Sequence, residues 1–96
     1  MIYTYIDEKF NHYSLIDIGI IQYSIALLVT EKNLGTCYPA QSVIYPDVIR
    51  EFVEFQANKE IVLGTAIGYP DERSQANRFV RKRGELADFV KWMDIV

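Results

Sequence analysis

The chain has 96 residues, half of them hydrophobic, and a formal net charge of −3. A chain of this length forms one domain, residues 1–96, and its apolar and aromatic content is typical of a globular protein and not of a disordered one. The acidic balance argues against a general nucleic-acid binder, so no nucleic-acid partner is expected.

The single cysteine and the single histidine point to no redox or metal chemistry. Cys37 has no second cysteine for an internal disulfide, and His12 lacks the spacings of a zinc site. Both are expected to be ordinary packing or surface residues. A reducing cytoplasm is the expected location of such a chain.

No targeting or membrane segment is expected. The charged residues 7–9 interrupt the start of the chain before an apolar region can build up, which argues against a signal peptide. The longest apolar stretch, residues 15–29, contains Asp17 and Gln22, and we predict that it is too short to cross a bilayer. No contact with a membrane is therefore expected.

A long apolar helix is the main predicted element. A short strand over Met1–Ile6 and a polar loop over Asp7–His12 precede it. From Leu15 to Glu31 the chain has no proline, and its apolar residues cover almost the whole helix circumference. Asn33, which tolerates the left-handed conformation, is expected to end the helix. A helix that is apolar all round must be buried, so we predict that it forms the interface of a dimer or higher oligomer.

The rest of the chain predicts a small α+β fold. Leu34–Tyr38 is expected to be extended, and Glu60–Ile67 is apolar enough for a central strand. Pro46 begins an amphipathic surface helix, whose apolar side comprises Val48, Ile49, Phe52, Val53 and Phe55. Leu86–Met93 is expected to form a short terminal helix. The prediction is two main helices, this terminal helix, and a sheet of two or three strands.

Half of the ten basic residues lie within residues 73–83, and this window contains no acidic residue. They are Arg73, Arg78, Arg81, Lys82 and Arg83. Such a window suits a local anion, or it is simply a solvated basic loop. No phosphate-binding glycine motif and no cysteine–histidine pair stands elsewhere in the chain.

Three segments stand in a recognisable order. They are NLGTCYPAQSVIYPDVIRE at residues 33–51, IVLGTAIGYPDE at residues 61–72, and NRFVRKR at residues 77–83. Together they resemble the C-terminal portion of the FMN-dependent nitroreductase family. The similarity extends over residues 13–92, and it is specific in the combination of segments. It implies a truncated version of the nitroreductase fold.

The resemblance implies an FMN site without a catalytic side chain or a metal. Backbone N–H groups of Ala40 and Gln41 would bond the pyrimidine and N5 edge of the flavin, where reduction develops negative charge. Arg81 and Arg83 would bind the FMN phosphate through their planar guanidinium groups.

The resemblance also implies an activity and a partner. The family transfers a hydride from NAD(P)H through flavin N5 to nitroaromatic or quinone acceptors, as a homodimer that packs through the long helix. Nothing in Met1–His12 corresponds to the family's N-terminal part. A separate N-terminal half is one explanation; the alternative is a non-catalytic, truncated dimerisation or binding module that no longer holds flavin.

Overall fold

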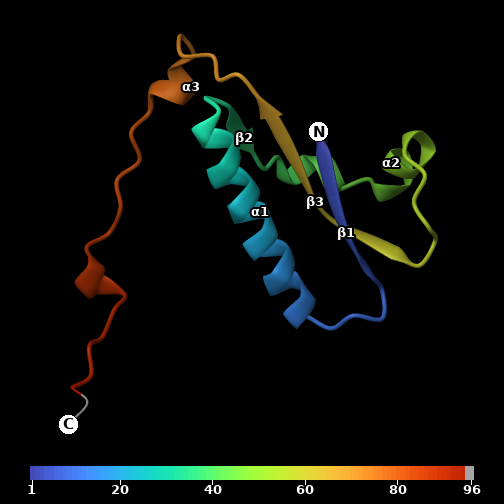
Figure 1. The fold of residues 1–96 in the computed structure, drawn as a ribbon, viewed down its shortest axis with the longest axis horizontal. Helices are drawn as coiled ribbons and strands as arrows, with labels where there is room; N and C mark the ends of the chain where they lie inside the picture. The colour runs from blue at the N-terminus through green and yellow to red at the C-terminus, as the bar shows by residue number, and fades with distance from the viewer. Residues whose placement is uncertain (95–96) are drawn as a thin grey trace.

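The fold is a three-stranded antiparallel sheet with one long helix beside it (Figure 1). The structure is a computed structural model, and it describes residues 1–94. Its elements are β1 (Ile2–Asp7), α1 (Tyr13–Glu31), β2 (Gly35–Cys37), η1 (Ala40–Val43), α2 (Pro46–Phe52), β3 (Lys59–Gly68), α3 (Gln75–Arg78) and η2 (Leu86–Asp88). The strand order is β1-β3-β2, so the predicted α+β class and the central position of β3 are confirmed.

The long helix ends where the sequence predicts. Asn33 has a φ of 59°, the left-handed conformation that asparagine tolerates. This turn directs the N–H of Leu34 back to the carbonyl of Val29 at 3.0 Å, so that one of the last helical carbonyls is satisfied. The chain then runs directly into β2, which pairs with the end of β3.

The two faces of the sheet receive different elements. β1 pairs with β3 from Ile2–Thr65 to Asp7–Lys59, with an irregularity after Thr4. Thr4 and Thr65 face α1, and their hydroxyl groups form hydrogen bonds with the side chain of Gln22 on that helix. The opposite face, at Gly64, receives η1.

Gln22 joins α1 to both long strands. Its side-chain oxygen accepts a 2.7 Å hydrogen bond from the hydroxyl of Thr65, and its amide nitrogen lies 3.3 Å from the hydroxyl of Thr4. Gln22 is 3% exposed and Thr65 is fully buried. The Gln22 backbone carbonyl also accepts a hydrogen bond from the hydroxyl of Tyr38. A polar side chain in an apolar helix therefore sets the position of that helix on the sheet.

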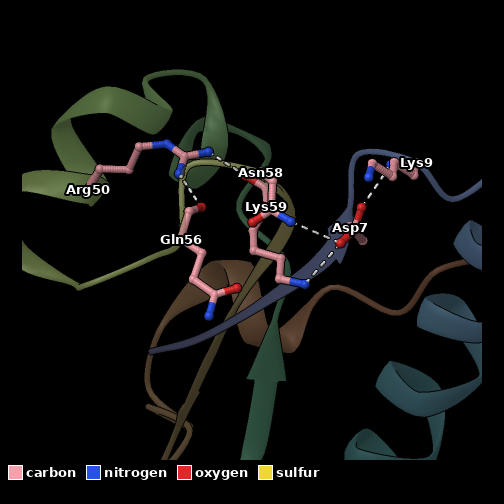
Figure 2. Close-up of polar contacts among 6 residues, drawn as sticks. All are labelled: Asp7, Lys9, Arg50, Gln56, Asn58 and Lys59. Atoms are coloured by element: carbon pink, nitrogen blue, oxygen red, sulfur yellow. Dashed lines mark hydrogen bonds and ion pairs between the residues drawn. The ribbon is translucent and has the colours of Figure 1, made fainter.

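A second group of polar contacts lies where β1 ends and β3 begins (Figure 2). The Asp7 carboxylate, at the end of β1, accepts hydrogen bonds from the side chains of Asn58 at 3.1 Å and Lys59 at 3.2 Å. Arg50 of α2 donates to the backbone carbonyls of Gln56 and Lys59. These contacts fix α2 and the start of β3 to the end of β1.

The chain exposes far more apolar surface than a compact monomer. Within residues 1–94, Ile49 and Ile61 are the buried apolar side chains. The accessible surface is 8713 Å², against about 5,700 Å² for a compact monomer of this mass. The radius of gyration is 17.5 Å, against about 12 Å for a compact domain of this length. Many of the exposed large hydrophobic side chains lie on α1. The apolar residues of this helix are not confined to one side, as the sequence predicts.

Two predicted helices are shorter than expected. The terminal helix predicted over Leu86–Met93 begins where expected but is a single 3₁₀ turn, Leu86–Asp88. A short helix is unstable without packing, and this part of the chain extends away from the sheet (Figure 1). α2 ends at Phe52, so that Val53 and Phe55 lie beyond it.

The length of α1 corrects another expectation. With 19 residues it is long and apolar enough to cross a membrane by length and composition, so the prediction that this stretch is too short is wrong. The helix includes residues on both sides of the apolar stretch counted from the sequence. Core helices of soluble proteins and N-terminal signal sequences meet the same criteria, so this result alone does not assign α1 to a membrane.

The Gln22 contacts predict a measurable loss of stability. Replacing Gln22 by Leu leaves the fully buried Thr65 hydroxyl without its acceptor, which costs about 1–3 kcal/mol. Combining it with Thr65→Val removes both polar partners, and we expect the double variant to lose less than the sum of the two single variants. Urea denaturation measures all three free energies. Additive losses would contradict the contact, and exposed Gln75→Leu is the control.

The Asp7 contacts predict a dependence of stability on pH. Hydrogen bonds from the Lys9 backbone and the Lys59 side chain lower the pKa of Asp7 below its usual 3.8. Because the folded pKa is the lower one, this stabilisation is present above about pH 4 and is lost as the pH falls through the folded pKa. Urea midpoints of the wild type and Asp7→Asn should therefore differ near pH 7 and converge near pH 2. Glu51→Gln, an exposed carboxylate, should show no such convergence.

Candidate functional site

Two neighbouring backbone donors stand at the start of η1. The chain leaves β2, turns at Pro39, and begins η1 at Ala40. The Ser42 N–H bonds the Pro39 carbonyl at 2.9 Å, and the first N–H groups of such a turn have no partner inside it. Within residues 1–94, the N–H groups of Ala40 and Gln41 donate no hydrogen bond, and both residues are exposed. They are available to an acceptor from outside the chain.

The surrounding elements hold η1 on both sides. The Tyr38 hydroxyl donates a 3.1 Å hydrogen bond to the Gln22 carbonyl of α1, which fixes the segment between β2 and η1. On the sheet side, Ser42 lies directly against Gly64 of β3. The position of η1 is therefore set by the same helix and strand that Gln22 joins.

The predicted phosphate ligands lie in a different part of the chain. We call residues 79–94 the arm; it follows α3 and extends away from the sheet (Figure 1). Arg81 and Arg83 lie in its irregular first part and are exposed. Within the described residues neither forms an ion pair. By contrast, Arg73 pairs with Asp71 at 3.9 Å, and Arg78 donates to the Glu72 carbonyl.

One copy of the chain does not bring the two parts of the predicted site together. Figure 1 places the arm on one side of α1 and η1 on the other side, next to β3. The residue types still suit FMN. Unpaired backbone donors fit the polar edge of the flavin ring, and unpaired arginines fit a phosphate. The donors and the arginines are thus chemically suitable and spatially separate.

The cavities lie elsewhere. A cleft of about 710 Å³ opens on the sheet face away from α1, lined by Met1, Tyr3, Tyr5, Val53, Glu54, Phe55, Gln56 and Lys59. The rings of Tyr5 and Phe55 meet edge to face with centroids 5.1 Å apart. A smaller recess of about 320 Å³ lies between β2 and the end of β3, beside the exposed Cys37. Neither cavity is lined by Ala40, Gln41, Arg81 or Arg83.

The residues that position η1 were not predicted from the sequence. Ser42 is a single serine in a predicted loop, and Gln22 stands out only as an interruption of the apolar stretch. Gly64 did carry a signal. A glycine inside a continuous apolar strand often marks a place where another backbone approaches closely.

Comparison with known proteins gives a distant match to a reductase. No protein-family model matches the chain. It is 28% identical over 93 residues to 4-nitrobenzoate reductase of Pseudomonas putida. The aligned part covers 97% of this chain and 40% of that protein, so the chain spans less than half the length of this relative. The match supports a distant nitroreductase-like relationship.

Proposed function

We propose that this chain carries part of the FMN site of an NAD(P)H-dependent oxidoreductase of the nitroreductase type. The observation that carries the proposal is the pair of unpartnered backbone N–H groups at Ala40 and Gln41, at the positions where the resemblance expects flavin contacts. The similarity to a nitrobenzoate reductase, which covers nearly all of this chain, supports the same assignment.

The chain's own residues have two roles in this proposal. Ala40 and Gln41 orient the flavin ring and stabilise the negative charge that reduction places on its pyrimidine edge. Arg81 and Arg83 bind the phosphate by paired, charge-assisted hydrogen bonds. When bound, FMN supplies hydride transfer from a reduced nicotinamide to a nitroaromatic or quinone acceptor.

A second copy of the chain is the proposed partner of α1. The surface in excess of a compact monomer, roughly 3,000 Å² on one chain, is more than enough for one side of an obligate oligomer interface. The exposed large side chains on the helix include Ile16, Ile20, Tyr23, Leu27 and Leu28. A membrane fits less well. Gln22, near the middle of α1, holds the sheet, whose strand edges would enter the lipid with the helix.

Two further hypotheses concern how the chain functions. About 60% of the matched reductase has no counterpart in this chain, so a separate N-terminal half would complete the pocket. Alternatively, the chain is a non-catalytic dimerisation or binding module without flavin. The separation of η1 from the arm in a single copy favours this second candidate (Figure 1).

The FMN proposal predicts binding that depends on two arginines. The purified chain should quench FMN fluorescence in a one-to-one titration. Arg81→Ala combined with Arg83→Ala should weaken that binding by at least about tenfold, because each charge-assisted contact contributes about 1.5–3 kcal/mol. Arg73→Ala combined with Arg78→Ala is the matched control, since those side chains are engaged with the turn before the arm.

The outcomes separate the candidates. A loss confined to the arm variant supports the proposed site. Equal losses in both variants indicate a general charge effect and contradict the assignment of Arg81 and Arg83. No quenching at high protein concentration supports the module without flavin, unless addition of an N-terminal half from the related reductase restores binding.

The dimer proposal predicts a particle of about twice the chain's 11.2 kDa in sedimentation equilibrium at micromolar concentration. Ile20→Glu combined with Leu27→Glu places charges on the exposed side of α1 and should convert this particle to a monomer. Phe52→Glu, at an even more exposed apolar residue of α2, is the control. A wild-type monomer would overturn the proposal.

A further inference from the structure

We propose that Gly64 and Ser42 are positioning residues, whose contact sets the distance between η1 and the sheet and so the place of the Ala40 and Gln41 donors. This inference rests on the proposed function for its purpose. Its geometry rests on the packing of η1 against β3 and involves neither the arm nor a second copy.

The space at Gly64 admits no side chain. A Cβ atom there would clash with the Ser42 Oγ, and it would lie 2.9 Å from the Ser42 Cβ and 3.1 Å from the Tyr3 Cε1. Gly64 does not have a positive φ, so its backbone conformation does not require glycine. Close approach is the remaining reason for glycine in the centre of a β-strand, where it otherwise weakens the sheet.

The strand cannot retreat from η1. Gly64 lies in the central strand, next to Thr65, whose hydroxyl bonds Gln22 on the other face of the sheet. A side chain at position 64 must therefore displace η1 or the ring of Tyr3. Since Ser42 is the nearer neighbour by both of its side-chain atoms, η1 is the element that moves.

Ser42 contributes its size and not its hydrogen bonding. Its Oγ is buried and has no hydrogen-bond partner among the described residues. Such a buried hydroxyl destabilises the fold and calls for an explanation. The explanation we infer is that a short side chain at position 42 acts as the spacer between η1 and the backbone of Gly64.

A displacement of Ser42 also moves the N–H groups of Ala40 and Gln41. Because the Ser42 N–H bonds the Pro39 carbonyl, residues 39–42 form one closed turn that moves as a unit. Ordinary contact with a Cβ begins at 3.4 Å, and the Ser42 Oγ can rotate away, whereas the Ser42 Cβ at 2.9 Å is fixed to the turn. Gly64→Ala must therefore move η1 by about 0.5 Å, which is enough to lengthen an ordinary hydrogen bond beyond its normal range. The donors of Ala40 and Gln41 would then no longer meet the acceptors of the ring.

The test uses a pair of variants with a built-in rescue. Gly64→Ala introduces the clash, and adding Ser42→Gly removes the two nearest of the three atoms that the new Cβ meets. Gly68→Ala is the matched control on the same strand, because a Cβ there meets nothing within 4 Å. Ser42→Val, which crowds the same contact from the surface turn, serves if Gly64→Ala does not fold.

Two readouts are measured. The first is the ¹H–¹⁵N chemical shifts of the Ala40 and Gln41 amides without FMN. The second is the FMN dissociation constant, with the visible spectrum of the bound flavin. We expect Gly64→Ala to shift both amides and to weaken FMN binding at least about tenfold, and Ser42→Gly to restore both in the double variant. The control should resemble the wild type.

The outcomes distinguish this inference from the proposed function. If the wild type does not bind FMN, the proposed function fails, and the amide shifts alone decide whether Gly64 and Ser42 position η1. Unchanged amides and affinity in Gly64→Ala overturn the inference. So does a perturbation that Ser42→Gly fails to reverse, because the contact is then not its cause.

Discussion

The hydrogen bonds of Gln22 are the constraint on which the rest of the structure depends. They join one residue of α1 to β1 through Thr4 and to β3 through Thr65. Since Thr65 is fully buried, its hydroxyl has no alternative in water, and the helix cannot rotate without leaving it unpaired. This fixes which side of α1 faces the sheet and leaves the remaining apolar surface of the helix outside.

Local patterns predicted most of the elements, because these elements follow from short-range effects. The continuous apolar run of β3 and the uninterrupted apolar stretch of α1 are visible in a window of residues. The left-handed end of α1 at Asn33 follows from the side chain itself. The terminal helix is shorter than predicted for the converse reason. Its residues have a helical pattern, but helix formation there depends on a surface to pack against, which the arm lacks within this chain.

The candidate site was predictable in type and not in arrangement. The positions of Ala40 and Gln41 came from resemblance, and the free N–H groups of η1 agree with the chemistry expected of them. The contacts that place them could not be read from the sequence. Ser42 and Gly64 are 22 residues apart and meet only through the antiparallel return of the chain. The location of Arg81 and Arg83 relative to η1 depends on the path of the arm, which no local pattern determines.

The proposed assembly would explain three features of the single chain together. These are the exposure of α1, the extended path of the arm, and the separation of η1 from Arg81 and Arg83. A chain that buries so little apolar surface leaves the arm without contacts that would offset the entropy of ordering it. A partner that covers α1 and orders the arm would supply those contacts before any cofactor binds. FMN would then bind the assembled form more tightly than the single chain, and by linkage it would favour assembly to the same extent. In this scheme, cofactor affinity and oligomeric state are two measurements of one equilibrium.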